Sequence, residues 1–263
     1  MLDVPGEPPL VFDLGTGLRA FGEELAGTAS NRPDVPGGAP AHGSEIAALL
    51  THLHWDHLIG LPFFAPLRHP GTRVEVFGPA QAGGLGCVLE EMLKPPFFPV
   101  EVAGFEGEVV LSEVVGGDDF AIGQAKVRAR WVPHVGRTLG YRVEQMGCSV
   151  AFVSDHQRPE GGVEVDAGVL ELCEGADLVV HDAQYSAEEF DSKAAWGHST
   201  VEYAVHVASE AGAKRLALFH HDPGHSDDDV DRLLEQASRL PEAASLAGIF
   251  AAYEGLAVDL GSP

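Results

Sequence analysis

A histidine-rich segment follows the apolar run Ile46–Leu50 and contains four side chains that can bind metal ions: His52, His54, Asp56 and His57. The apolar run predicts a buried strand, and the segment begins where that strand ends. Side chains at positions i and i+2 of an extended chain share a face, so His52 and His54 are expected side by side. Asp56 and His57 follow where the chain turns away from the strand direction, so their side chains can bind a second ion close to the first. Because imidazole and carboxylate are ligands for Zn, Mn and Fe, this spacing favours a site for two adjacent metal ions.

Further ligand-type residues stand where other apolar strands are expected to end. The predicted strands and the residues that follow them are 126–131 with His134, 148–154 with Asp155, 178–180 with His181, and 215–219 with His220. Other predicted strands cover residues 10–14, 73–77, 108–113, 120–122 and 138–144, and predicted helices cover 18–26, 80–93 and 169–174, with two more beginning at the capping box Ser199–Glu202 and at Ser226. Strands that alternate with helices and deliver polar groups at one end describe an α/β layered fold, with its site along one sheet edge.

A glycine-rich turn lies near the N-terminus. Gly15 and Gly17 follow the first predicted strand, but the third glycine of a dinucleotide-binding motif is misplaced. The turn is instead expected to bring Asp13 near the histidine-rich segment. Residues 28–44 are rich in proline and glycine and predict a surface loop that returns the chain to the strand before His52.

The composition limits the classes of partner and compartment. Lys and Arg number 16 against 40 Asp and Glu, which gives a net charge of −24. Such an acidic field repels polyanions, and no Lys/Arg cluster offers a basic patch for a nucleic-acid backbone. The three cysteines are scattered without a C-x-x-C pair, which favours a reducing compartment over a disulfide framework. No signal peptide or membrane-length apolar run is found, so a cytoplasmic protein without a membrane partner is expected.

The order His-x-His-x-Asp-His over residues 52–57 resembles the signature of the metallo-β-lactamase superfamily. Three further residues resemble the later motifs of that family: His134, Asp155 and His220. Gly197–Thr200 and Val180–Gln184 narrow the resemblance to the RNase Z-like, cyclic-nucleotide phosphodiesterase-like branch of bacterial metal-dependent hydrolases. The resemblance implies a four-layer αββα sandwich and a single domain over residues 1–263.

The resemblance also implies a ligand set for two divalent metal ions. One ion would lie on three histidines: His52, His54 and His134. The other would lie on Asp56, His57 and His220, and Asp155 would bridge both. Zinc is the expected metal, with manganese and iron as alternatives, and a hydroxide that bridges the two ions would attack the substrate.

Four residues form the catalytic set that the resemblance implies: Asp56, His181, Asp182 and His198. His198 is the candidate proton donor to the leaving alkoxide. Asp182 is expected to hold His198 or His181 in the right tautomer. Whether His156 and His221 touch the site is left open.

Two departures from the family pattern matter. Members that process tRNA carry a long arm before the bridging aspartate, whereas only about twenty residues, used up by two predicted strands, separate His134 from Asp155 here. No tRNA substrate is therefore expected. The chain also begins close to its strand 10–14, so the sheet is expected to lack the usual first strand and to have either a partner subunit, as in a homodimer, or a distorted edge there.

The function expected on these grounds is a binuclear metal-dependent hydrolase acting on a small phosphodiester such as a cyclic nucleotide. One alternative is a carboxyl-type hydrolase of a lactone, thioester or β-lactam that uses the same metal site. Another alternative is a metal-bound sensor or scaffold without turnover.

Overall fold

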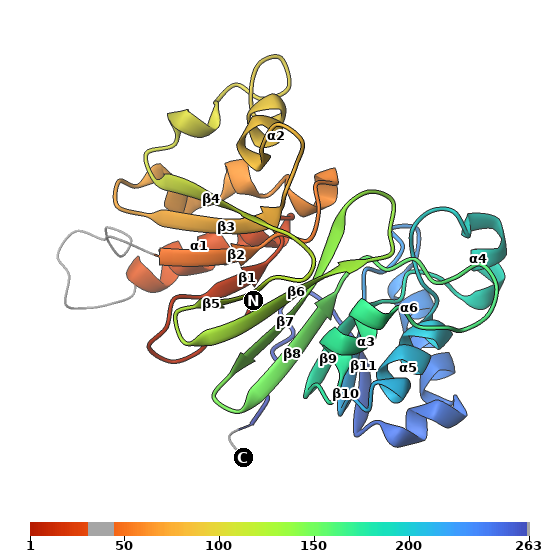
Figure 1. Cartoon of the computed structure of the whole chain (residues 1–263). Helices are drawn as coiled ribbons and strands as arrows, with labels where there is room; N and C mark the ends of the chain where they lie inside the picture. Colours follow the sequence, from red (N-terminus) through yellow and green to blue (C-terminus); the bar gives the residue numbers. More distant parts are fainter. Residues whose placement is uncertain (31–44, 262–263) are drawn as a thin grey trace. The chain divides into compact units, whose positions relative to one another are not determined.

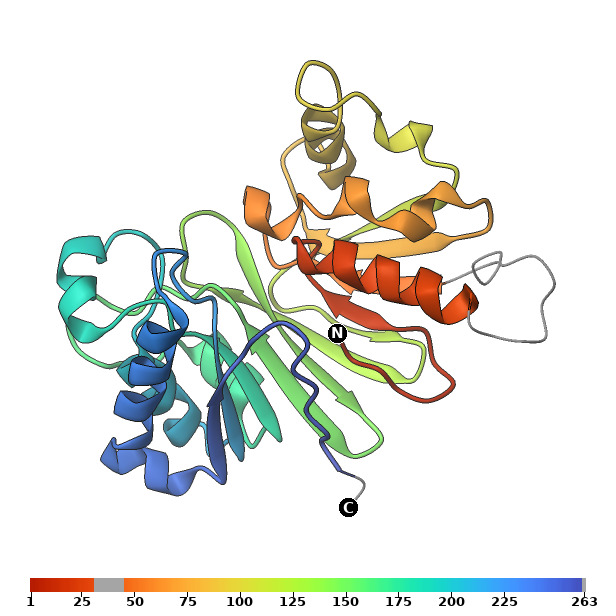
Figure 2. The ribbon, with the colours of Figure 1, turned by 180° about the vertical axis from the view of Figure 1, so that it is seen from behind.

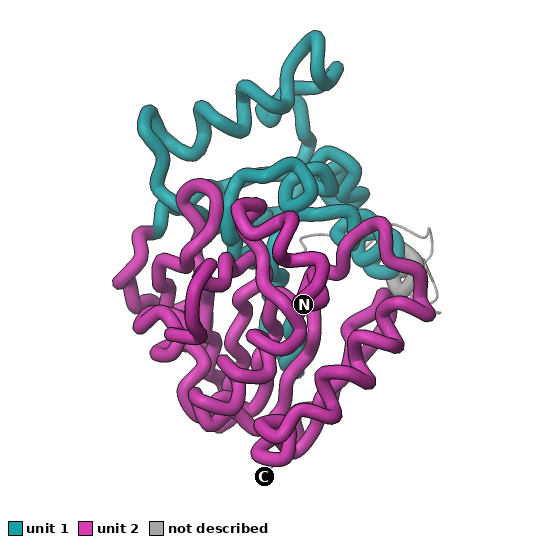
Figure 3. Tube along the Cα trace, turned by 90° about the vertical axis from the view of Figure 1, so that its right-hand side faces the viewer, with its two compact units in different colours: residues 1–114 teal, residues 115–263 magenta. Residues whose placement is uncertain are grey.

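In the computed structural model of the chain, residues 1–30 and 45–261 are described (Figure 1). The loop expected over residues 28–44 falls almost entirely outside the described residues. The chain divides into two compact units, Met1–Val114 and Val115–Pro263, which Figure 3 colours separately. Each unit is built on its own β-sheet.

Unit 1 contains a parallel four-stranded sheet with the strand order β1-β2-β3-β4. Its strands are β1 (Leu10–Phe12), β2 (Glu45–Leu49), β3 (Arg73–Pro79) and β4 (Glu108–Val114). Its helices are α1 (Gly17–Ser30), α2 (Leu85–Met92) and the 3-10 turns η1 (Trp55–His57), η2 (Leu61–Phe63), η3 (Ala65–Arg68) and η4 (Val102–Gly104). Four of the five residues of β2 are buried, because a parallel strand covered on both faces carries apolar side chains on both.

The strand β1 lies at the edge of the sheet of unit 1. One side of β1 pairs with β2, and on the other side Leu2 and Leu10 exchange two backbone hydrogen bonds, at 2.7 and 3.1 Å. The sequence predicts a partner subunit or a distorted edge at this position. In the structure, the chain's own first residues cover the start of this edge.

Unit 2 contains a seven-stranded mixed sheet with the order β11-β10-β9-β8-β7-β6-β5 among the described residues. Its strands are β5 (Asp119–Ile122), β6 (Ala125–Val132), β7 (Thr138–Gln145), β8 (Cys148–Val153), β9 (Leu178–Asp182), β10 (Arg215–Phe219) and β11 (Gly248–Ala251). Its helices are α3 (Ala167–Cys173), α4 (Ala187–Lys193), α5 (Val201–Glu210), α6 (Asp227–Ser238) and the 3-10 turn η5 (Pro241–Ser245). The helices α3, α5 and α6 lie along the part of the sheet that holds β8, β9 and β10 (Figures 1 and 2). Buried side chains of these helices and strands form one core.

The strand directions in unit 2 bring the predicted ligand residues to one sheet edge. The strands β8, β9 and β10 are parallel neighbours, with Val153 opposite His181 and Phe219 opposite Asp182. β6 runs in the same direction, since it is antiparallel to β7, which is antiparallel to β8. The chain therefore leaves all four strands at the same edge, as the sequence predicts.

The strands β7 and β8 are joined by a two-residue hairpin turn. Met146 and Gly147 both have positive φ, 52° and 80°, which is typical of the tight turn that matches strand twist. The residues between His134 and Asp155 are thus used up by this hairpin. No arm is inserted there, in agreement with the prediction.

Two local predictions need correction, and two elements were missed. The helix predicted over 80–93 begins only at Leu85, because Gly83 and Gly84 have φ of 89° and 96° and cannot be helical. The cap of α5 is Thr200, whose side chain accepts the Tyr203 N–H, and not Ser199 as the capping-box pattern predicts. The helix α4 and the strand β11 were not predicted from the sequence.

Candidate metal centre

The loop that leaves β2 gathers the histidines of unit 1. The ring centroid of His52 lies 4.3 Å from that of His54 and 4.2 Å from that of His57. Asp56 and His57 lie on η1, and Asp56 Oδ2 is 3.2 Å from His57 Nε2. His52 and His57 are buried, whereas His54 and Asp56 are exposed. The four ligand residues predicted in unit 1 therefore lie together in one loop.

Asp13, at the end of β1, fixes this loop. Its Oδ1 accepts the backbone N–H of Thr51 at 2.7 Å, and its Oδ2 lies 2.8 Å from Nδ1 of His57. The Thr51 hydroxyl donates to Asp13 Oδ1 at 2.9 Å and lies 2.9 Å from Nδ1 of His52. Asp13 thus holds two predicted ligands, one directly and one through Thr51. The expectation that the N-terminal turn brings Asp13 to the histidine-rich segment is confirmed.

Gly15 allows the turn after Asp13 to approach the histidine loop closely. A Cβ on Gly15 would lie 2.4 Å from the carbonyl oxygen of Asp56, and a Cβ on Gly60 would lie 1.8 Å from the carbonyl oxygen of Gly15. Gly17 has no atom within 4 Å of such a Cβ and only begins α1. Glycine is therefore required at positions 15 and 60 by close backbone packing.

These contacts determine which ring nitrogen is available in unit 1. The Nδ1–H of His57 donates to the Asp13 carboxylate, while the Thr51 hydroxyl, whose proton points to Asp13, accepts the Nδ1–H of His52. The lone pair of each ring then lies on Nε2. Metal-binding histidines are held in this way, by a partner on the nitrogen that does not bind the ion.

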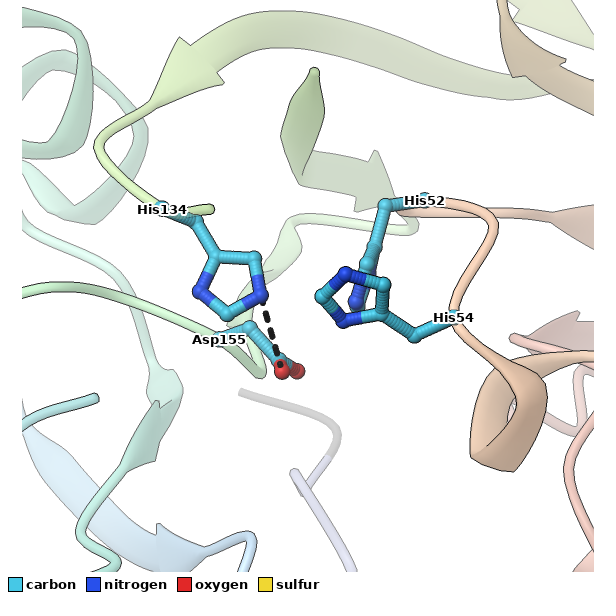
Figure 4. A group of neighbouring side chains, drawn as sticks. All are labelled: His52, His54, His134 and Asp155. Carbon is cyan, nitrogen blue, oxygen red and sulfur yellow. Dashed lines mark ion pairs between the residues drawn. The ribbon is translucent and has the colours of Figure 1, made fainter. Parts of the chain in front are cut away.

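Asp155 is the centre of the group in unit 2. Its Oδ2 lies 3.6 Å from His134 Nε2, 3.5 Å from His220 Nε2 and 3.9 Å from His198 Nδ1. Ligand atoms of Asp155, His198 and His220 all lie within 4.8 Å of one another. Figure 4 draws Asp155 and His134 of this unit, with their ion pair dashed, together with His52 and His54 of unit 1. Unit 2 thus brings together every ligand residue that the sequence predicts in it.

His134 is held by the turn that precedes α5. The carbonyl oxygen of Gly197 accepts the Nδ1–H of His134 at 2.6 Å, which leaves Nε2 towards Asp155. Gly197 has φ of 96°, and a Cβ there would lie 2.5 Å from His134 Nδ1. The glycine of the Gly197–Thr200 motif is therefore needed so that the backbone can reach the histidine.

Asp182 holds His198. Its Oδ2 lies 2.8 Å from His198 Nδ1 and 3.0 Å from the backbone nitrogen of His156, and its Oδ1 accepts the N–H groups of Gln184 and Ser199. Four donors thus converge on one fully buried carboxylate. Of the two histidines that the sequence pairs with Asp182, the carboxylate contacts His198.

His181 lies deeper and pairs with His156. The Nδ1–H of His181 donates to the backbone carbonyl oxygen of Asp182 at 2.7 Å, and His181 Nε2 lies 2.9 Å from His156 Nδ1. Burial lowers the pKa of both imidazoles below the ordinary value of 6.5, most strongly for His156, where the neighbouring His181 and His134 add to the effect. Both rings are fully buried, and the contacts of His181 link it to His156 and to the backbone of Asp182.

His220 follows β10 with a left-handed backbone, at φ of 58°. Its Nδ1 lies 3.3 Å from the side-chain amide of Gln184, and its ring stacks on that of His198 at 4.9 Å. His221 instead turns to the C-terminal part of unit 2, where its Nε2–H donates to the carbonyl oxygen of Ala252 at 3.1 Å. Burial lowers the pKa of His221.

Sequence reasoning placed Asp13 near the histidine-rich segment but did not foresee that it anchors two histidines, and it assigned no role to the Gly197 carbonyl oxygen beside His134 or to Gln184 beside His220. The motifs that contain these residues were interpreted only through their histidine and aspartate side chains. The available signal for Asp13 was its residue type, since an aspartate that directly follows a short apolar strand can adopt the left-handed backbone found there, at φ of 57°.

Residues 12–221 match the family model of the β-lactamase superfamily domain. The chain belongs to the metallo-β-lactamase superfamily. The match runs through both units, and membership confirms the predicted α/β fold and the predicted class of metal-dependent hydrolase. Among the described residues, no helix combines the length and apolar character needed to cross a membrane.

Relatives in the superfamily include proteins named as ribonucleases. A protein named ribonuclease Z from Brevibacillus brevis is 43% identical over 272 residues, which cover 85% of this chain and 81% of that protein. The fold is shared with the metallo-β-lactamase fold protein YhfI from Bacillus subtilis, at a TM-score of 0.63 and 17% identity over 94% of this chain and 85% of that one. It is also shared with Zn²⁺-bound PqqB from Methylobacterium extorquens, at a TM-score of 0.65 and 19% identity over 98% and 85%.

Proposed function

We propose that this metallo-β-lactamase superfamily hydrolase is a binuclear metal-dependent phosphodiesterase that acts on a small phosphodiester such as a cyclic nucleotide. The observation that carries the proposal is the Asp182–His198 pair, at 2.8 Å, beside the carboxylate of Asp155. An imidazole held by a buried carboxylate on one nitrogen can deliver a proton from the other. A phosphodiester needs such a donor, because its leaving group departs as an alkoxide.

The donors in the two units fit divalent ions of the zinc type. Nε2 is the nitrogen left for a metal on His52, His57 and His134, because a partner holds Nδ1 of each ring. One ion would be held by His52, His54 and His134 and the other by Asp56, His57 and His220, and Asp155 would serve both. The family match covers residues 12–221 and so includes the metal donors of both units, which supports this assignment.

Bound ions would supply Lewis acidity, which makes water a nucleophile near neutral pH and offsets charge that develops on phosphoryl oxygens. The chain's own residues then manage orientation and protons. Asp182 keeps the Nδ1–H of His198 directed to itself, so the proton delivered to the leaving oxygen comes from Nε2. His156 and His181 hold the loop that carries Asp182 against the loop that carries Asp155.

Ribonuclease activity is the second candidate, because the relative from Brevibacillus brevis carries the name ribonuclease Z. Against it stand the net charge of −24 and the hairpin that fills the stretch between His134 and Asp155. Hydrolysis of a carboxyl compound at the same centre, and metal binding without turnover, are the remaining alternatives.

The decisive experiment is a substrate panel with metal-loaded protein. Protein reconstituted with Zn²⁺ or with Mn²⁺ is expected to hydrolyse bis-p-nitrophenyl phosphate and cyclic nucleotides, and to lose this activity with EDTA. Nitrocefin, a thioester and a precursor tRNA are offered in parallel. Turnover of the tRNA alone would favour the ribonuclease, turnover of the carboxyl substrates alone would favour the carboxyl hydrolase, and no turnover with full metal content would favour a scaffold.

We also propose a reducing, cytoplasmic location and a homodimer. The three cysteines are free thiols, which suits such a compartment. The short edge strand β1, which Leu2 covers only at its start, supports a second subunit at that edge. Sedimentation of the purified protein tests the homodimer, and a monomer at micromolar concentration would exclude it.

A further inference from the structure

A tight turn joins the end of α4 to the motif that carries His198. The backbone N–H of Trp196 donates to the carbonyl oxygen of Lys193 at 2.9 Å, and the next residue, Gly197, binds His134 through its own carbonyl oxygen. Trp196 is therefore fixed two residues from His198, yet its side chain is 62% exposed. The indole is thus open to solvent next to the motif that carries His198.

A lysine ammonium lies on one side of this indole. Lys193 Nζ is 5.8 Å from the Trp196 ring centroid and 4.4 Å from that of Tyr185, and it pairs with Asp222 at 2.8 Å. The Tyr185 ring lies 6.0 Å from the ring of His198. Contacts thus run from Trp196 through Lys193 and Tyr185 to His198. A cation against one face of an indole leaves the other face for a planar group.

We propose that Trp196 is a stacking platform for a planar heteroaromatic ring, such as a nucleobase, on the leaving side of the substrate. The inference rests on the proposed phosphodiesterase function and narrows its substrate class to nucleotides. His198 donates to the leaving oxygen, so the part of the substrate that departs lies beside His198 and within reach of the neighbouring turn.

The test compares two product analogues that differ only in the base. Adenosine 5′-monophosphate and ribose 5-phosphate are measured as competitive inhibitors of bis-p-nitrophenyl phosphate hydrolysis. Stacking on an aromatic side chain contributes about 1–3 kcal/mol per base, so the nucleotide is expected to inhibit about 5- to 150-fold more tightly. Trp196→Ala should remove this ratio and leave the inhibition constant of ribose 5-phosphate unchanged. Phe97→Ala removes a similarly exposed aromatic, at 68%, from unit 1 and should keep the ratio.

A binding measurement separates this inference from the proposed reaction. The chain has three tryptophans, so the double variant Trp55→Phe, Trp131→Phe leaves Trp196 as the sole indole reporter. Adenosine 5′-monophosphate should quench its fluorescence and ribose 5-phosphate should not. Quenching without hydrolysis of any phosphodiester would sink the proposed function and keep the platform. Equal inhibition by the two analogues, or a ratio that survives Trp196→Ala, would overturn the platform while the phosphodiesterase stands.

Discussion

Three histidines of the candidate centre are held through one ring nitrogen by a residue that does not itself belong to the ligand set. Asp13 holds His57, Thr51 holds His52, and the Gly197 carbonyl holds His134. Such partners fix the tautomer and the ring orientation before an ion arrives. Affinity for metal is therefore expected to depend also on side chains that contact the ligand histidines and do not themselves bind the ion.

Asp13→Ala is expected to weaken metal binding about 10–100-fold, the usual effect of removing a partner of a ligand histidine. The change leaves His57 and Thr51 without their common acceptor. Competition against a chromogenic chelator measures the affinity. Asp13→Asn keeps a residue that tolerates the φ of 57° and should have a smaller effect, while the exposed Asp3→Ala should have none. Wild-type affinity in Asp13→Ala would contradict the anchoring role.

His198→Ala is expected to lower kcat by about 10²–10⁴-fold on a substrate with a poor leaving group, because the departing alkoxide then lacks its proton donor. The loss should be much smaller with bis-p-nitrophenyl phosphate, whose leaving group departs readily without a proton. Kinetics on both substrates, with metal content determined in each preparation, test this. Equal losses on both substrates would mean that His198 serves the metal centre and not the leaving group.

At the scale of elements, buried polar contacts connect the loop after β8, the strand β9 and the loop before α5. His156, which follows β8, pairs with His181 of β9, and the Ser199 hydroxyl from the loop before α5 donates to the His156 carbonyl oxygen. The pair is fully buried and polar, so it stabilises the fold only while it remains uncharged.

The free energy of unfolding of the metal-free protein should therefore fall as pH falls below about 6.5, the pKa that an imidazole regains on unfolding. Because burial lowers the pKa of His156 and His181 in the folded state, the unfolded chain binds more protons in this range. The expected slope is up to about 1.4 kcal/mol per pH unit for each group. Urea unfolding at several pH values measures it. His181→Gln should reduce the slope, and the exposed His69→Gln should not.

The sequence pattern predicts the strands correctly where an apolar run is followed by a candidate ligand residue. β2, β8, β9 and β10 are such strands, and the residues predicted after them reach one edge in each unit. The start of α2 was wrong because two left-handed glycines override helix periodicity. Sequence spacing could not decide which histidine contacts the Asp182 carboxylate. His181 is the sequence neighbour of Asp182, but the folded chain brings His198 to the carboxylate and leaves His181 on the backbone carbonyl oxygen.

At the scale of the whole molecule, the net charge of −24 acts on any anionic substrate before it reaches the centre. Like charges slow association, and salt screens them. We expect kcat/KM to rise with ionic strength between about 20 and 200 mM, modestly for bis-p-nitrophenyl phosphate and steeply for an oligoribonucleotide. Steady-state kinetics in graded salt at fixed metal content test this. A steep fall for the oligoribonucleotide would instead reveal a basic binding path and favour the ribonuclease.

His220 has a left-handed backbone, which costs a residue with a Cβ about 1–2 kcal/mol relative to glycine. Selection for heat resistance alone would consequently favour His220→Gly, a replacement that relieves the conformation while deleting a candidate ligand. Thermal stability and hydrolytic activity thus favour different residues at position 220. A library of variants selected only for stability at high temperature should therefore be enriched in inactive variants.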